Sequence, residues 1–363
     1  MLKNILSLTK KLISIKSTFD SPKALEEILE LSLLHLKGFT IEQFKKNGVK
    51  SILVYNSKTR PKKFKVLLNG HLDVVPGKDY RYIPEIKGNK LYGVGSMDMK
   101  ASVACLIEVF SYVANQVNYP LGLQLVTDEE IGGYNGTKYQ IEKGVRAEFI
   151  ITGESTSFDI VNKAKGILQV KISAKGKTAH GAYPWAGENA IWKINEFLNA
   201  LQKKYPIPSQ EIWAMTVNVS KIETTNKVFN KIPDDCTAWL DVRFVLEEYN
   251  IVKKNLLRLL PKGLTLEIVN DEPALSTDEN NEFIKLLTLK TKQVTGNNVR
   301  LRGANGSSDV RHFARINCAG IEFGPVGGNI GSDQEWVDIP SLEKYYQTLI
   351  IFLLDVDKNK LLL

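Results

Sequence analysis

The feature that most constrains the fold is a set of short apolar runs in the first half of the chain, each ending directly in titratable residues. Three such runs are predicted to be buried strands, at 64–69, 121–127 and 149–152. The first is followed by His71, the second by Asp128 and the third by Glu154. Between the first two, residues 99–117 carry apolar side chains at helical spacing. Alternating strands and helices indicate an α/β layer fold, in which ligand sites form at the carboxyl ends of strands.

From about Lys163 the pattern changes to a second kind of domain. Strands and helices are predicted there in the order β-α-β-β-α-β, over residues 167–174, 188–204, 213–222, 236–245, 246–260 and 264–269. This order is that of a ferredoxin-like α+β domain. Because α/β character returns after 272, with a helix at 280–294, we predict a mixed-sheet catalytic domain over 1–163 and 274–363. The α+β domain is inserted at 164–273.

Composition excludes several classes of protein. With 43% hydrophobic and 24% charged residues, the 363-residue chain is neither disordered nor fibrous. The net charge of +8 is spread as single lysines and short pairs, so we expect no nucleic-acid partner. No run of 18 apolar residues exists, so we expect no membrane partner. The three cysteines form no C-x-x-C pair, and residues 1–16 lack the features of a signal peptide. A cytoplasmic location is therefore expected.

Two residues near the predicted strand ends have both a structural and a functional interpretation. His71 lies two residues before Asp73, a spacing in which one ring nitrogen binds a metal while a carboxylate orients the other. A hydrogen-bonded structural histidine is the alternative. Asp98 lies in a glycine-containing loop directly before a predicted helix. It is either an N-cap or a carboxylate that bridges two cations.

Three consecutive carboxylates, Asp128, Glu129 and Glu130, follow the second predicted strand. On a plain surface their mutual repulsion is tolerable, but at a buried strand end they need a countercharge such as a metal ion. One of them can bind the metal while its neighbour acts as general base. Glu154 is a further carboxylate at a strand end.

Taken in order, the motifs of this chain resemble those of one family of di-zinc amidohydrolases and exopeptidases. Its members include succinyl-diaminopimelate desuccinylase, acetylornithine deacetylase, aminoacylase-1 and glutamate-carboxypeptidase-like enzymes. The resemblance runs nearly end to end and is carried by these segments: GHLDVVP at 70–76, GVGSMDMK at 93–100, TDEEIGG at 127–133, GEST at 153–156, GKTAH at 176–180, GENAI at 187–191, NKIP at 230–233, DVR at 241–243, SDVR at 308–311 and FGP at 323–325.

The resemblance implies a set of metal ligands. His71 and Glu154 would bind one zinc ion, Asp98 would bridge it to a second, and Glu130 would bind the second. Co²⁺ or Mn²⁺ are substitutes for Zn²⁺. The resemblance also implies a cis peptide bond after Asp98.

The same resemblance implies catalytic and substrate-binding roles. Glu129 would be the general base, and Asp73 would orient His71. His180, in the inserted domain, would polarise the scissile carbonyl, often from the partner subunit of a homodimer formed through that domain. Asn230 and Arg311 would hold a carboxylate on a small-molecule substrate, a task that suits the guanidinium group.

One position departs from the family pattern. The last metal ligand of the family is a His four residues before a Glu, and here Gly331 precedes Glu335. Natural loss with a weakened second site, a substitute ligand such as Asp333 or His312, and an engineered substitution all remain open. We expect one tightly bound metal, a second bound weakly or not at all, and slow hydrolysis. Gly331→His should raise the metal content and the turnover, although a positive φ at this glycine would strain a histidine there.

The implied function is hydrolysis of an amide bond in an N-acyl amino acid or small peptide, as in deacylases, desuccinylases and carboxypeptidases. The sequence leaves the acyl group open. The alternative is a catalytically weakened or inactive family member that binds acylated amino acids or peptides.

Overall fold

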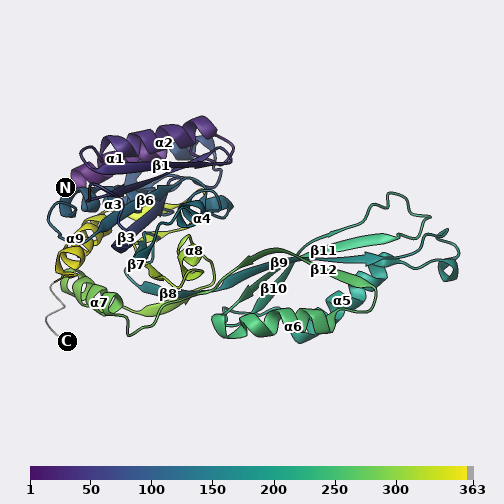
Figure 1. The fold of residues 1–363 in the computed structure, drawn as a ribbon. Helices are drawn as coiled ribbons and strands as arrows, with labels where there is room; N and C mark the ends of the chain where they lie inside the picture. Colours follow the sequence, from purple (N-terminus) through teal and green to yellow (C-terminus); the bar gives the residue numbers. More distant parts are fainter. Residues whose placement is uncertain (358–363) are drawn as a thin grey trace. The chain divides into compact units, whose positions relative to one another are not determined.

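The three predicted strands lie side by side in a nine-stranded sheet of the computed structural model, which describes residues 1–357. β3 (Phe64–His71) pairs in parallel with β6 (Leu121–Val126) on one side and with β7 (Ala147–Thr152) on the other (Figure 1). The register sets His71 opposite Val126. The carboxyl ends of the three strands therefore meet at one edge of the sheet, as predicted.

The other strands make the sheet mixed. Its order is β1-β2-β6-β3-β7-β15-β8-β13, with β14 paired to β8. These strands have the following bounds: β1 Thr40–Lys46, β2 Val49–Tyr55, β8 Ile160–Ala164, β13 Leu275–Ser276, β14 Leu301–Ala304 and β15 Ala319–Glu322. β1 and β2 are antiparallel neighbours, whereas β15 runs parallel to β7. The predicted mixed-sheet α/β fold is confirmed.

Helices pack on both faces of this sheet. Their bounds are α1 Leu2–Ser14, α2 Pro22–Leu34, α3 Lys100–Val113, α4 Thr137–Glu142, α7 Glu282–Thr295, α8 Val310–Ala314 and α9 Ile339–Asp355. α3 packs against β3, β6 and α9, and α8 packs against β7 and β15. The helix predicted over 99–117 is shorter than expected, because it ends where Asn56 Nδ2 donates to the Ala114 carbonyl.

The two faces of β3 differ toward its carboxyl end, because successive side chains of a strand point to opposite faces. Val66 and Leu68 are fully buried in the apolar core that includes α3. On the other face, Asn69 Nδ2 donates to Gln124 Oε1 at 2.8 Å. Gly70 lies against α3 so closely that a Cβ there would come within 2.8 Å of Val103 Cγ2. Glycine at this position therefore lets the strand reach His71 without displacing the helix.

A small four-stranded sheet brings the C-terminal part of the chain beside the Asp98 loop. Its order is β16-β17-β5-β4, with β16 Gly327–Gly328, β17 Trp336–Asp338, β5 Lys90–Tyr92 and β4 Glu85–Lys87. Trp336 lies opposite Tyr92. The residues just before β17 are consequently held next to the residues that follow β5.

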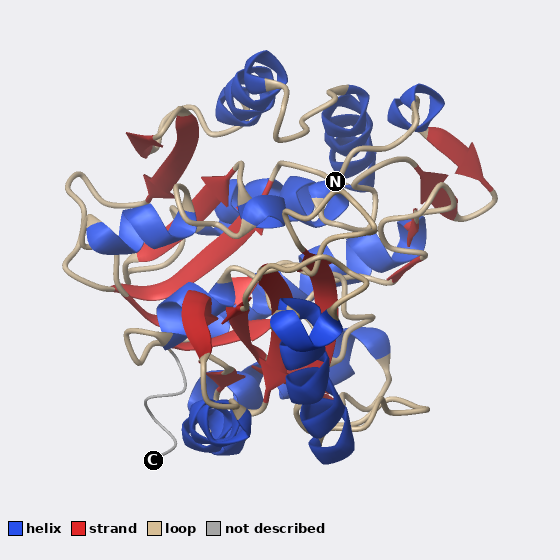
Figure 2. Ribbon diagram, turned by 90° about the vertical axis from the view of Figure 1, so that its right-hand side faces the viewer, coloured by secondary structure: helices blue, strands red, loops and turns tan. Residues whose placement is uncertain are grey.

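Residues 164–275 contain the predicted ferredoxin-like arrangement. Its elements are β9 Gly166–Lys175, α5 Ala190–Lys204, β10 Thr216–Glu223, β11 Asp235–Phe244, α6 Tyr249–Leu259 and β12 Leu264–Glu272. The sheet order is β10-β11-β9-β12, and all its pairs are antiparallel. Asn189 begins α5 as an N-cap, since its Oδ1 accepts from Ile191 N at 2.9 Å. Figure 2 shows the strands in red and the helices in blue.

The chain divides into two compact units. Unit 1 comprises Met1–Lys163, Ser276–Arg302 and the described residues from Ser308 onward, and unit 2 comprises Ala164–Leu275 and Gly303–Ser307. The segment at 303–307 belongs to unit 2 although the sequence pattern assigned it to the catalytic domain. The predicted end of the catalytic domain, 358–363, lies outside the described residues. No helix within 1–357 has both the length and the apolarity needed to span a bilayer.

Candidate metal centre

The site is built at the strand ends of unit 1. His71 is the last residue of β3, Glu129 and Glu130 form a short 3₁₀ turn after β6, and Glu154 follows β7. Asp98 lies in the loop between β5 and α3, and its peptide bond to Met99 is cis. The cis bond implied by the resemblance is therefore confirmed.

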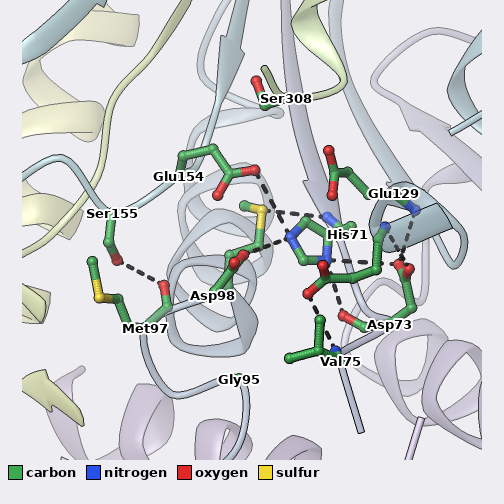
Figure 3. A network of polar contacts seen from close by, with 12 residues as sticks. His71, Asp73, Val75, Gly95, Met97, Asp98, Glu129, Glu154, Ser155 and Ser308 are labelled. Atoms are coloured by element: carbon green, nitrogen blue, oxygen red, sulfur yellow. Dashed lines mark hydrogen bonds and ion pairs between the residues drawn. The ribbon is translucent and has the colours of Figure 1, made fainter. Parts of the chain in front are cut away.

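Three of the predicted ligands converge on one point (Figure 3). His71 Nε2 lies 2.8 Å from Asp98 Oδ1 and 3.8 Å from Glu154 Oε1. One ligand atom from each of these residues lies within 4.8 Å of the others. His71 is only 1% exposed, whereas the carboxylates of Asp98 and Glu154 are half-buried.

The protonation of His71 is set by Asp73. The ring Nδ1 lies 2.9 Å from the Asp73 backbone carbonyl, which can only accept a hydrogen bond. Nδ1 is therefore the protonated nitrogen of the neutral ring, and the lone pair of Nε2 points at the two carboxylates. This is the arrangement that metal-binding histidines use.

The Asp73 side chain has a further role in holding the acidic loop. Its carboxylate lies 3.6 Å from His71 Nδ1 and accepts hydrogen bonds from the backbone N–H groups of Glu129 and Glu130, at 3.2 and 2.9 Å. Glu130 Oε1 in turn accepts from Val75 N at 3.3 Å. The histidine loop and the acidic loop are thus fastened to each other.

Glu129 and Arg311 form an ion pair beside the donor cluster. Arg311 Nη1 lies 3.5 Å from Glu129 Oε1, and Nη2 donates to the Gly132 carbonyl at 2.7 Å. The arginine is 3% exposed. It therefore contacts both the predicted general base and the loop that carries it.

Burial of several carboxylates together shifts their pKa values upward. Desolvation raises the pKa of Glu129 and Glu154 well above the usual range, and the nearby charge of His71 only partly opposes this. For Glu130 the pKa rises to about 7, again chiefly through burial. Burial opposes charge on His71, but the hydrogen bonds to Asp73 and Asp98 outweigh it, so its pKa is well above the ordinary value.

The residues present fit a divalent metal ion. One imidazole nitrogen with carboxylate oxygens is a donor set that zinc accepts, and a cation would compensate charges that burial otherwise makes costly. Within residues 1–357, His71, Asp98 and Glu154 form the one group of three such donors. The geometry therefore fits one metal. Glu130, the fourth predicted ligand, is not part of this group, and its Oε1 accepts from Val75 N.

The predicted second site has no third donor at position 331. Gly331 has φ +66° and lies in an exposed turn, where a Cβ would meet no other atom within 4 Å. The two substitutes considered above have other partners. Asp333 forms an ion pair with Lys78, and His312 Nε2 lies 2.9 Å from the Gly132 carbonyl.

The two predicted site residues of unit 2 lie on neighbouring segments. His180 forms an isolated β-bridge with Lys231, and Gly181 N donates to the Asn230 carbonyl at 2.7 Å. His180 and Asn230 are both exposed. The ring of His180 packs against that of Tyr183, with centroids 5.7 Å apart.

Sequence reasoning missed a group of buried polar residues behind the acidic loop. Thr137 Oγ1 donates to Asp309 Oδ2 at 2.6 Å, and the Asp128 carboxylate accepts from the backbone N–H groups of Asn135 and Gly136. Glu335 is a further buried carboxylate near the Asp98 loop. Asp309 and Glu335 both lie in or beside quoted motifs, but nothing in the sequence indicates which groups they bind.

A carboxylate-rich donor cluster at parallel strand ends, in a chain with an inserted second domain, is compatible with a metal-dependent hydrolase. The family described as peptidase family M20/M25/M40 matches residues 67–355. The chain belongs to this family. The predicted class, a metal-dependent hydrolase of amide bonds, is confirmed with it.

Curated relatives match over almost the whole chain. A succinyl-diaminopimelate desuccinylase of Buchnera aphidicola subsp. Cinara cedri is 29% identical over 378 residues, covering 96% of this chain and 98% of the relative. One of Nautilia profundicola is 28% identical, covering 92% and 94%.

Solved structures show the same fold at low sequence identity. A Bacillus cereus aminopeptidase has a TM-score of 0.80 at 17% identity, covering 98% of this chain and 99% of that one. A Sulfolobus solfataricus metallo-carboxypeptidase has 0.77 at 17% identity, covering 97% and 99%. A Bacillus subtilis protein described as a dinuclear metal-binding peptidase has 0.74 at 14% identity, covering 98% of each chain.

For the metal-free protein we predict that stability falls as the pH rises from about 5 to about 7. Glu130 holds a proton with a pKa of about 7 in the folded chain against 4.5 ordinarily, so the folded state keeps a proton that the unfolded state has lost. The raised pKa of His71 acts in the same direction. Thermal melts after chelation measure the effect. Glu130→Gln is the control and should show a weaker pH dependence, and an identical dependence in both proteins would contradict the prediction.

Proposed function

We propose that the chain is a zinc-dependent hydrolase of the amide bond in an N-acyl amino acid or small peptide that bears a carboxylate. The observation that carries this proposal is the convergence of His71 Nε2 with the Asp98 and Glu154 carboxylates beside Glu129. The names of the relatives support it, since they include desuccinylases and a metallo-carboxypeptidase. The enzymes so named remove different groups from their substrates. The proposal therefore specifies hydrolysis of an amide bond and does not specify which acyl group or residue is removed.

His71, Asp98 and Glu154 would hold the first zinc ion, and Asp98 and Glu130 would hold the second. Co²⁺ or Mn²⁺ can replace zinc, since imidazole and carboxylate ligands bind these ions too. When bound, zinc supplies Lewis acidity that polarises the scissile carbonyl and makes water easier to deprotonate. Asp73 keeps the proton on His71 Nδ1, which directs Nε2 toward the ion.

The reaction itself depends on proton transfer by Glu129. Its carboxylate takes a proton from the attacking water and delivers it to the leaving nitrogen, while Arg311 holds it in place through their ion pair. His180 donates to the developing oxyanion of the substrate. Asn230 and Arg311 bind the carboxylate of the substrate.

Replacing Glu129 with Gln is expected to lower turnover by about 10²- to 10⁴-fold, because an amide cannot accept the proton. Zinc content, measured on the purified protein, should stay unchanged, because Glu129 is not a ligand. Glu130→Gln is the matched control, an adjacent substitution of the same kind that should keep the tightly held zinc ion and bind less additional zinc when the metal is in excess. Loss of zinc from the Glu129 variant would contradict the assignment of Glu129 as a base that binds no metal.

The second metal site is proposed to be weak in this chain. Catalytic zinc usually has three protein ligands, and the glycine at 331 leaves the second site with Asp98 and Glu130. After removal of excess metal, we expect close to one zinc per chain by elemental analysis. Two tightly held ions per chain would contradict this.

Position 331 offers a gain-of-ligand test with a matched control. Gly331→His adds an imidazole, and although φ +66° strains any side chain by about 1–2 kcal/mol, excess zinc should offset that cost. Zinc titration should therefore reach more than one ion per chain, and turnover should increase. Gly331→Ala carries the same strain without a donor and should stay at one. Equal stoichiometry in the two variants would show that position 331 does not face the second site.

The alternative function rests on the same glycine. A chain with one tightly held metal could bind acylated amino acids or peptides with little turnover. Retention of Glu129, the residue needed for proton transfer, favours the enzyme. A hydrolysis screen with N-succinyl, N-acetyl and dipeptide substrates separates the two functions, because the binding protein would bind without turnover.

We propose further that the chain is a homodimer formed through the inserted domain, with His180 completing the site of the partner subunit. The exposed position of His180 and the edge strand β10 on the unit 2 sheet support this proposal. The solution mass should be that of a dimer. Mixed and re-equilibrated His180→Ala and Glu129→Gln proteins should regain activity, because one site of each mixed dimer has both residues. A fully active monomer, or no recovery on mixing, would contradict the trans role.

The cytoplasmic location predicted from the sequence is part of the proposal. All three cysteines, Cys105, Cys236 and Cys318, are buried free thiols, which supports a reducing compartment.

A further inference from the structure

We propose that Glu335 is a positioning residue for the metal centre, because it fixes the loop that carries Asp98. The inference deepens the proposed function and rests on it. It assigns a role to a carboxylate that lies outside the donor cluster and has no part in the proton transfer described above.

Glu335 binds three backbone N–H groups of the Asp98 loop. Its Oε1 accepts from Met97 N at 2.7 Å and from Asp98 N at 3.1 Å, and its Oε2 accepts from Gly95 N at 3.2 Å. The residue is 2% exposed, so these N–H groups have a carboxyl acceptor in a place shielded from water. Hydrogen bonds to a charged acceptor are stronger than those between neutral groups.

The position of Glu335 is itself fixed from two directions. Its backbone carbonyl accepts from Arg81 Nη2 at 2.9 Å. It directly precedes β17, whose Trp336 pairs with Tyr92 of β5. The carboxylate therefore reaches the Asp98 loop from a rigid base, although it lies 237 residues away along the chain.

The same loop is also tied to the segment that carries Glu154. Ser155 Oγ donates to the Met97 carbonyl at 2.8 Å, so both polar groups of the Met97 backbone are bound (Figure 3). One of the N–H groups bound by Glu335 belongs to Asp98 itself. The Glu335 carboxylate therefore fixes the backbone position from which the Asp98 side chain extends. Residues that orient metal ligands in this way usually affect metal affinity strongly.

The segment before β17 thus contacts the site through Glu335 and not through position 331. Gly331 has no side chain to offer, whereas Glu335, four residues later, binds the loop of the bridging Asp98. A purely structural carboxylate would stabilise the fold without influencing metal affinity. A positioning carboxylate changes metal affinity through Asp98.

The test measures Zn²⁺ affinity of the metal-free full-length chain in competition with a chromophoric chelator. Glu335→Ala should weaken zinc binding by about 10- to 100-fold. Glu335→Gln should weaken it less, because the amide oxygen can still accept from Met97 and Asp98 while the amide nitrogen faces the donor of Gly95. The Gln variant also keeps the test usable if the Ala variant does not fold.

Asp338→Ala is the matched control for loss of a carboxylate contact in the same segment, at the last residue of β17. The Asp338 carboxylate accepts from Ser341 N at 2.9 Å at the start of α9 and makes no bond to the Asp98 loop. This variant should melt at a lower temperature and keep its zinc affinity within about twofold. A residue outside the donor cluster affects metal affinity only when it orients a metal ligand, and Asp338 orients none.

A double-mutant cycle with Asp98→Asn tests the route of the effect. If Glu335 acts through Asp98, Glu335→Ala should cost much less zinc affinity in the Asp98→Asn background than in the wild type. Wild-type affinity in a folded Glu335→Ala protein, or equal losses in both backgrounds, would overturn the proposal. A wild-type chain that binds no zinc would contradict the proposed function on which it rests.

Discussion

The convergence of half-buried carboxylates on one buried imidazole is the constraint on which the site depends. His71 and the carboxylates of Asp98 and Glu154 meet within 4.8 Å, and burial raises the pKa of Glu154 and Glu129 far above the usual range. Such a cluster is costly unless protons or a cation compensate it. A metal ion supplies that compensation at neutral pH and would convert an unfavourable arrangement into a binding site.

The surrounding structure holds these charges in place through backbone N–H groups. Asp73 binds those of Glu129 and Glu130, and Glu335 binds those of the Asp98 loop. Each of these two buried carboxylates thus accepts hydrogen bonds from a loop that carries a candidate metal ligand or the candidate base. The geometry of the centre follows from these bonds together with the parallel strands that end beneath it.

Much of this site could be predicted from the sequence because strand ends follow directly from apolar runs. The positions of His71 and Glu154 needed only the rule that parallel strands finish at one edge of a sheet. The partner of Arg311 could not be predicted, since its ion pair with Glu129 joins segments that are distant in sequence. The role of Glu335 was hidden for the same reason. The left-handed backbone of Gly331 likewise depends on a turn whose geometry the sequence does not specify.

The most direct test of the account is the anomalous diffraction of crystals grown with zinc and measured at its absorption edge. The account predicts one dominant peak within bonding distance of His71 Nε2 and of oxygens from Asp98 and Glu154, with zinc bonds of about 2.0–2.2 Å. A dominant peak that His71 does not contact, or two peaks of equal strength, would contradict it.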